Sequence, residues 1–291
     1  MSALRFKQVD VFTRAPFLGN PVAVVLDAER LGADQMQRIA GWTNLSETTF
    51  VLSPSSPKAD YRLRIFTPRQ ELPFAGHPTI GSAHAVLESG FATARKGRLC
   101  QECSAGVIDL TIDSSDDGER IFIRAPKAKI SAFEIEQSTR LFRALGLPMK
   151  DFLPPLHVDV GVAWLIVDLK DARSVDHLNP DLDAVLKISL ETNAAGVTVF
   201  GLTDAGPARM HARSFAPALG VSEDPVCGSG NAAIAAFLIH TGLVGEIGNE
   251  YLARQGMNVG RDGLVAVRID GEAISFGGYA VTCVEGSLRV V

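Results

Sequence analysis

The order of apolar and polar positions along the chain occurs twice. In the first half, alternation and short apolar runs predict strands, and two segments with helical spacing predict helices. These strands cover residues 5–12, 22–26, 48–52, 61–66, 107–112 and 121–123, with helices over 34–41 and 78–87. The second half repeats the order, with strands near 158–160, 164–167, 197–202, 209–215, 264–269 and 274–276, and helices after Pro180 and over 228–242.

A short motif marks the repeat. Residues 64–68 read Arg-Ile-Phe-Thr-Pro and residues 213–217 read Arg-Ser-Phe-Ala-Pro. The matching arginines, phenylalanines and prolines lie 149 residues apart in a chain of 291. An acidic loop and a glycine-containing helix start follow each motif. Such self-similarity indicates two copies of one module.

The element content predicts an α+β architecture. Strands dominate, each half holds two helices, and the connections do not resemble regular strand-helix-strand crossovers. We therefore expect two similar domains, over residues 1–127 and 128–278. The junction is expected near 125–132, where Pro126 and several lysines interrupt the pattern. A further strand over about 279–291 is expected to return to the first domain.

Composition narrows the class of protein. The chain has 46% hydrophobic and 21% charged residues and a net charge of −5. It can bury a large core and has no basic surface for nucleic acid. No apolar run of about 18 residues predicts a membrane span, and the first ten residues contain no apolar signal core. We expect a cytoplasmic protein with no membrane or nucleic-acid partner.

The four cysteines do not predict a metal site. Cys100 and Cys103 form a single C-x-x-C, without the second cysteine or histidine pair that a zinc site requires. Ordinary reduced thiols are the expected state, and no metal is expected.

Two helix starts are the first candidates for binding. One begins at Gly76 and the other at Gly228, at corresponding places in the repeat. A helix start presents backbone N–H groups and a dipole that favours an anion, and glycine permits close approach of a ligand. The alternative is that these glycines serve only tight turns. Their occurrence in both halves favours a carboxylate-binding site.

Titratable residues near these starts are candidates for chemistry. His77 follows Gly76, and Asp224 precedes the second start. Glu47 lies just before a predicted strand, and its counterpart 149 residues later is Gly196. A carboxylate that occurs in one half and not in the other fits a role that a single half performs. On spacing alone, an acid that merely caps a neighbouring turn explains Glu47 equally well.

One motif suggests a cofactor. Residues 228–233 match the dinucleotide pattern G-x-G-x-x-A. That pattern requires a strand immediately before it, whereas Pro225 and two acidic residues stand here. Acidic residues would also repel a pyrophosphate. We expect no nicotinamide or flavin site here.

As an ordered set, the motifs resemble the PhzF-type phenazine-biosynthesis family. In chain order, the motifs are 9–12 (VDVF), 19–21 (GNP), 44–48 (NLSET), 66–68 (FTP), 75–79 (AGHPT), 223–229 (EDPVCGS) and 277–280 (GGYA). Each motif alone is weak, but together they span nearly the whole chain.

The resemblance implies a diaminopimelate-epimerase-like fold. This is two pseudo-symmetric domains, each a curved, mostly antiparallel sheet or open barrel around a central helix, with the active site between them. It implies a homodimeric, cofactor-independent isomerase that acts on a small carboxylate-bearing metabolite, a dihydro-hydroxyanthranilate in the phenazine enzyme. The implied catalytic residues are Glu47, which moves a proton between carbons, with His77 and Asp224 assisting. Residues expected to bind the substrate are Gly76, Gly228, Ser229 and Cys227.

Two other functions stay open at this point. Epimerases of the same fold use two cysteines as acid and base. Here Cys227 precedes one helix start but Ala75 precedes the other, so a racemase would need a non-cysteine partner for Cys227. Cys227 also replaces the threonine more usual in PhzF-like sequences, either as a plain small residue or as a thiol with a lowered pKa. A non-catalytic binding protein is the third hypothesis.

Overall fold

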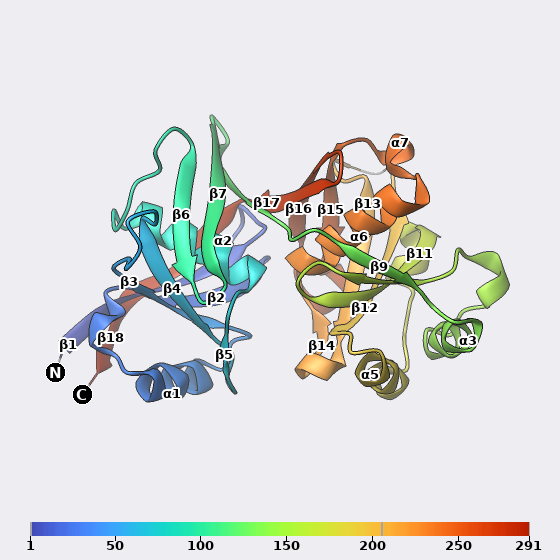
Figure 1. The fold of residues 1–291 in the computed structure, drawn as a ribbon, viewed down its shortest axis with the longest axis horizontal. Coiled ribbons are helices and arrows are strands. Elements are labelled where there is room, and N and C mark those ends of the chain that lie inside the picture. The colour runs from blue at the N-terminus through green and yellow to red at the C-terminus, as the bar shows by residue number, and fades with distance from the viewer. Residues whose placement is uncertain (1, 205, 291) are drawn as a thin grey trace. The chain divides into compact units, whose positions relative to one another are not determined.

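A computed structural model describes residues 2–204 and 206–290, and the chain divides into two compact units. The first, unit 1, contains the residues up to Ile123 and those from Gly277 onward. The second, unit 2, runs from Arg124 to Phe276. Figure 1 shows both ribbons. The domain limits expected from the sequence, at residues 127 and 278, stay a prediction.

Unit 1 contains a mixed sheet. Its strands pair in the order β18 (Ala280–Val290), β1 (Ser2–Val11), β2 (Asn20–Val25), β3 (Thr48–Leu52), β4 (Tyr61–Phe66), β6 (Arg98–Cys103), β7 (Gly106–Ser115) and β8 (Gly118–Arg124). The short β5 (Glu71–Leu72) also pairs with β4. The pairs β2–β3 and β4–β6 are parallel, and the other pairs are antiparallel. The last strand thus lies beside the first, red beside blue in Figure 1.

The parallel pairs correct one expectation from the sequence. Parallel neighbours need a crossover connection, commonly a helix. Helix α1 (Ala33–Thr43) lies between β2 and β3 in the chain, and α2 (Gly76–Glu88) lies between β4 and β6. Strand-helix-strand crossovers are therefore present. They were missed because β6, with its two cysteines and Gln101, does not have an apolar pattern.

Unit 2 has the same strand order and directions. Its strands pair in the order β9 (Lys129–Ala132), β10 (Leu156–Asp159), β11 (Ala163–Asp171), β12 (Gly196–Leu202), β13 (Met210–Ala216), β15 (Glu250–Gln255) and β16 (Gly263–Asp270). β14 (Val221–Asp224) pairs with β13, and β17 (Ala273–Gly278) follows β16 in the chain. The parallel pairs, β11–β12 and β13–β15, occupy the places of β2–β3 and β4–β6. β9 takes the place of β18, so the predicted interruption at 125–132 contains a strand.

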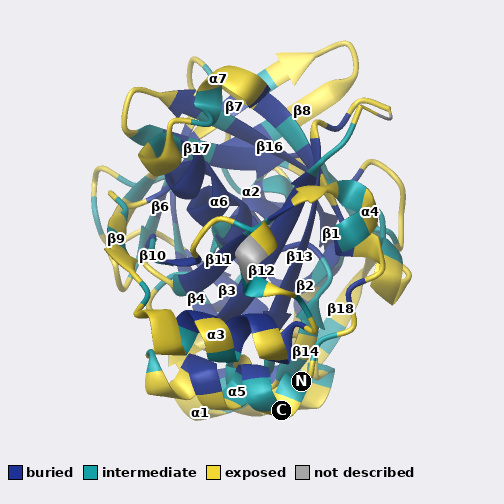
Figure 2. Cartoon of the chain, turned by 90° about the vertical axis from the view of Figure 1, so that its right-hand side faces the viewer, coloured by how far each residue is buried: buried dark blue, intermediate teal, exposed yellow. Residues whose placement is uncertain are grey.

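Two helices per half is correct for unit 1 and wrong for unit 2. Unit 2 contains α3 (Ile135–Ala144), α4 (Ala172–Asp176), α5 (Leu182–Glu191), α6 (Gly228–Thr241) and α7 (Val244–Ile247). The described residues also form short 3-10 turns: η1 (Ala28–Arg30), η2 (Met149–Asp151), η3 (Pro217–Leu219) and η4 (Met257–Val259). Helix α6 is apolar on all sides and almost wholly buried, as Figure 2 shows.

Helices cover both faces of the unit 1 sheet. On one face, α2 approaches so closely that a Cβ at Gly81 would lie 2.4 Å from Val22 Cγ1. On the other face, Met36 and Ala40 of α1 pack in a cluster with Phe50. Coverage on both sides explains why β2 and β3 are buried along almost their whole length instead of alternating.

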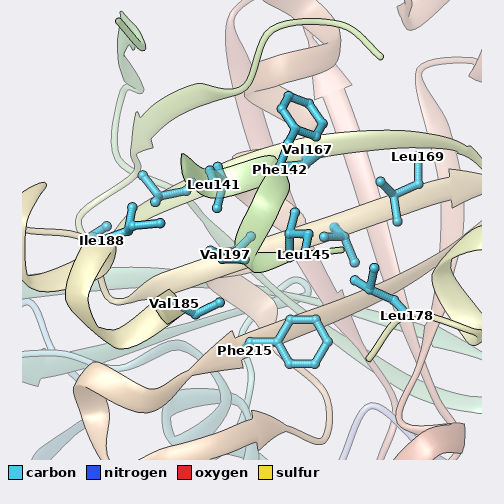
Figure 3. Packing of buried hydrophobic residues seen from close by; sticks show 14 of the residues in the cluster. Leu141, Phe142, Leu145, Val167, Leu169, Leu178, Val185, Ile188, Val197 and Phe215 are labelled. Atoms are coloured by element: carbon cyan, nitrogen blue, oxygen red, sulfur yellow. The ribbon is translucent and has the colours of Figure 1, made fainter. Parts of the chain in front are cut away.

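The core of unit 2 follows the same plan. Figure 3 shows apolar residues of α3 and α5 packed against β11 and β12, with Phe142, Val185 and Val197 among them. The opposite face of these strands meets α6, where Trp164 Nε1 reaches Ser229 at the helix start. Among the residues that the structure describes, no helix is long and apolar enough to cross a membrane.

Candidate active site

The backbone around Glu47 is fixed on both sides. Helix α1 ends at Thr43, and the left-handed conformation of the next residue, Asn44 (φ 56°), turns the chain back towards the sheet. The Thr43 and Thr48 hydroxyls are 2.6 Å apart across the short loop. The Glu47 carbonyl accepts a hydrogen bond from Ala23 N at 3.4 Å. Glu47 therefore stands at the entrance to β3, beside the parallel neighbour β2.

His77 is the second residue of α2. The helix begins at Gly76 after an extended Ala75, which has no polar side chain to cap it. Pro78 is thus the third helical residue, not the first as the sequence predicted. Thr79 accepts a hydrogen bond from the buried Gln101 Nε2 at 3.1 Å, which ties this first turn to β6.

Glu47 and His77 meet at the start of α2. His77 Nε2 lies 3.3 Å from Glu47 Oε2, and the side chains are only 10% and 15% exposed. Burial raises the pKa of the Glu47 carboxyl, and a hydrogen bond with Ser46 opposes this rise. A buried carboxyl beside an imidazole can exchange a proton nearer to neutral pH than a solvated glutamate can.

Cys227 caps the second helix start. Its Sγ accepts a hydrogen bond from Gly230 N at 3.3 Å and lies 3.6 Å from Ser229 Oγ. The residue is 3% exposed. Burial, together with the nearby Asp224 charge, raises the pKa of the thiol well above its usual value. This is the opposite of the lowered pKa considered from the helix start, and it favours a neutral capping thiol.

Gln255 holds the loop that carries Asp224. The Asp224 carboxyl accepts a hydrogen bond from Val226 N at 3.1 Å. Gln255 Nε2 donates to the Asp224 carbonyl at 2.9 Å, and its Oε1 accepts from Cys227 N at 3.2 Å and Asn231 Nδ2 at 3.1 Å. The fully buried Gln255 therefore fixes this loop against the first turn of α6.

Sequence reasoning missed Trp164 as a residue of this start. Its Nε1 donates to Ser229 Oγ at 3.0 Å, and the side chain is 1% exposed. The signal in the sequence was the repeat: Trp164 begins the predicted strand 164–167, where the matching strand 22–26 of the first half begins with Val22.

The predicted site residues form two groups. Unit 1 brings Glu47, Gly76 and His77 together, and unit 2 brings together the group made up of Asp224, Cys227, Gly228 and Ser229. Their catalytic and substrate-binding roles stay predictions. Among the described residues, no group of three or more His, Cys, Asp or Glu side chains could hold a metal ion.

The counterpart of Glu47 shows why the two groups differ. A Cβ at Gly196 would lie 1.9 Å from the carbonyl oxygen of Phe215. Real Cβ atoms do not approach this closely, so the second copy has no room for any side chain where the first carries its carboxylate.

Comparisons with known proteins agree with this architecture. Residues 9–286 match the model of the family described as phenazine biosynthesis-like protein. The crystal structure of a PhzF-family protein from Bacillus anthracis covers all of both chains, with a TM-score of 0.86 and 30% identity. A Schizosaccharomyces pombe protein named antisense-enhancing sequence 1 is 42% identical over 98% of this chain and 99% of its own. The trans-2,3-dihydro-3-hydroxyanthranilate isomerase of Pseudomonas chlororaphis is 33% identical over 96% and 97%.

Several relatives are named as isomerases, and they identify the class of this protein as an isomerase. The chain belongs to the phenazine biosynthesis-like (PhzC-PhzF) family.

Proposed function

We propose that this isomerase moves a proton between carbon atoms of a small carboxylate-bearing metabolite, with Glu47 as the acid and base. The observation that carries the proposal is the largely buried Glu47 carboxyl, 3.3 Å from His77 Nε2 at the start of α2. Burial raises its pKa, which suits a group that must take up a proton and return it.

The step needs no net change in the enzyme. Ionised Glu47 takes a proton from one carbon of the substrate, and the electron pair moves into the adjacent π system. The resulting carboxylic acid returns a proton to another carbon, so that a double bond changes position. His77 stabilises the ionised form of Glu47 between these events. The chemistry balances without an oxidant, a metal or a bound cofactor.

A carboxylate on the substrate is the second part of the proposal. Helix starts favour anions, and α6 adds the Ser229 hydroxyl. We propose that a helix start holds this carboxylate, with Gly76 of unit 1 and Gly228 and Ser229 of unit 2 as the candidate hydrogen-bond donors. Cys227 would shape the second start, and Asp224 would assist proton transfer. The relative that acts on trans-2,3-dihydro-3-hydroxyanthranilate supports a cyclic, carboxylate-bearing compound as the first candidate.

The test is turnover of trans-2,3-dihydro-3-hydroxyanthranilate in deuterated water, followed by a panel of small unsaturated carboxylates. We expect the protein to introduce deuterium at carbon. Glu47→Gln should lower kcat by about a hundredfold or more, because the amide cannot carry the proton. Glu119→Gln, which changes an exposed carboxyl of the same unit, is the control and should behave as the wild type. A folded Glu47→Gln protein with full turnover would overturn the assignment.

Assembly is proposed separately. We propose a homodimer, as the resemblance to PhzF proteins implies, with no nucleic-acid or membrane partner. Light scattering of the purified chain measures its mass directly, and a mass near 31 kDa would contradict the dimer.

A further inference from the structure

The hydrogen bond between Trp164 and Ser229 limits what that hydroxyl can recognise. An indole N–H donates and cannot accept. Because Trp164 is 1% exposed and its Nε1 lies 3.0 Å from Ser229 Oγ, water does not readily replace this donor. One acceptor position of Ser229 is therefore filled by a donor from the protein.

Cys227 adds to this arrangement. Its sulfur lies 3.6 Å from Ser229 Oγ and already accepts the N–H of Gly230. Either atom of this pair can be the donor, so the partner of Ser229 whose direction is fixed is the Trp164 indole. Because the indole occupies an acceptor position, the Ser229 hydroxyl is biased towards donating to a ligand at the α6 start.

Comparison with unit 1 shows that the fold does not require this pair. Val22 occupies the place of Trp164 in the parallel ladder, and His77 occupies the place of Ser229 as the second helical residue. Val22 is apolar and packs close to Gly81 instead. In unit 2, by contrast, the indole of Trp164 contacts the hydroxyl of Ser229. The second residue of α6 is therefore a serine and not a titratable residue such as His77.

We propose that Trp164 is a positioning residue that fills an acceptor position of Ser229 and so directs this hydroxyl to donate, so that the α6 start selects carboxylates over the corresponding amides. A carboxylate only accepts hydrogen bonds, whereas an amide also presents N–H groups, which compete with the indole for the Ser229 oxygen. The inference rests on the proposed function in one respect, namely that Ser229 contacts the carboxylate of the substrate.

The first experiment observes the hydrogen bond in the free protein. The chain contains two tryptophans, so a ¹⁵N-labelled sample has two indole N–H resonances. Trp42 is 76% exposed, and Trp42→Phe assigns its resonance by removing it. We expect Ser229→Ala to shift the Trp164 resonance and speed its exchange with solvent while Trp42 stays unchanged. If Ser229→Ala changes neither the position nor the exchange rate of the Trp164 resonance, the inference is wrong.

The second experiment measures selectivity with benzoate and benzamide as matched probes. We expect the wild type to bind benzoate more tightly, and Trp164→Phe to reduce the ratio of the two affinities by about two- to tenfold, the range of one hydrogen bond. Trp42→Phe should keep the wild-type ratio. Thermal melting and the backbone amide spectrum establish that each variant is folded. An unchanged ratio in folded Trp164→Phe would overturn the inference.

The two proposals fail in different ways. If Ser229→Ala binds benzoate as the wild type does, or if benzoate does not bind the wild type, recognition of the carboxylate at α6 is wrong, and this inference is wrong with it. If Ser229→Ala weakens benzoate binding but Trp164→Phe keeps the ratio, the proposed function stands and only the role of Trp164 is wrong. Deuterium incorporation that depends on Glu47 is unaffected by either result.

Discussion

The same arginine–glutamate pair is built into both units, at the surface of one and in the interior of the other. Arg64 and Glu71 form a two-point ion pair in unit 1, with side chains 27% and 33% exposed. In unit 2, Arg213 and Glu223 form the same pair with 8% and 9% exposed. Each guanidinium also lies over the phenylalanine two residues later, at 5.1 and 4.8 Å.

The buried copy has a further structural task. Arg213 Nη1 donates to the carbonyl oxygens of Val175 and Leu178, at 3.1 and 2.7 Å. These carbonyls belong to α4 and to the loop after it. One repeated motif has thus become a surface ion pair in unit 1 and an internal brace for a helical connection in unit 2. Sequence similarity between the copies does not imply equal energetic importance.

The largest expected effect comes from removing the two arginines separately. Arg213→Met leaves Glu223 buried without its partner and two carbonyls without a donor, and should cost about 3–5 kcal/mol of unfolding free energy. Arg64→Met, the matched variant, should cost about 1 kcal/mol or less because water can solvate Glu71. Urea unfolding of both variants measures the difference. Equal losses would show that burial does not distinguish the copies.

Gly196 provides a second way to probe the asymmetry. Gly196→Ala places a methyl group against the Phe215 carbonyl and should cost about 1–3 kcal/mol, or prevent folding. Glu47→Ala changes the equivalent position of unit 1 and should be tolerated better, since that position already holds a side chain. Urea midpoints and soluble yields of the two variants test this. A fully stable Gly196→Ala protein would contradict the steric explanation.

The pH dependence of the unfolding free energy should reveal the raised pKa of the Glu47 carboxyl. Its pKa is higher in the folded protein than in the unfolded chain, so the folded state retains the proton longer. Stability contributed by the protonated form is therefore lost as pH rises through the folded pKa. Glu47→Gln removes this loss, and its advantage over the wild type should grow from acidic to neutral pH. Urea unfolding across this range measures the difference in unfolding free energy between Glu47→Gln and the wild type, with Glu119→Gln as the control. A difference that does not change with pH would show that the Glu47 pKa is normal.

The smallest effects are expected at the helix caps. Ala75 leaves α2 without a side-chain cap, whereas Cys227 caps α6. Cys227→Ala should cost about 1 kcal/mol, and Ala75→Ser should add up to about 1 kcal/mol. If α2 binds the substrate anion, Ala75→Ser should also raise KM, because the new hydroxyl competes for the same N–H groups. Thermal melting and steady-state kinetics separate the two effects.

Local sequence signals predicted much of the fold. Helix α6 begins at Gly228 and ends before Gly242, which has a left-handed conformation, as the glycine positions indicated. β18 lies where a further strand was expected. The match to PhzF structures confirms the family resemblance. β6 was missed because Gln101 is buried by its partners Tyr61 and Thr79, which lie far away in the chain.

The candidate site was predictable in its members but not in its contacts. Glu47 and His77 were named from motifs, yet their 3.3 Å approach joins a loop before β3 to a helix 30 residues later. The raised pKa of Glu47 depends on its burial in the folded chain. Trp164 carried no motif, and its role arises from the packing of β11 against α6. Such tertiary contacts have no local sequence signal.

The return of β18 to β1 also concerns the order of synthesis. Unit 2 is continuous in the chain, whereas unit 1 receives its edge strand only from the final residues. On a ribosome, unit 2 has all its segments before unit 1 can close. We expect nascent chains that end near residue 276 to protect unit 2 from protease while unit 1 stays sensitive. The glutamate that we assign to proton transfer would then lie in the part of the protein that matures last.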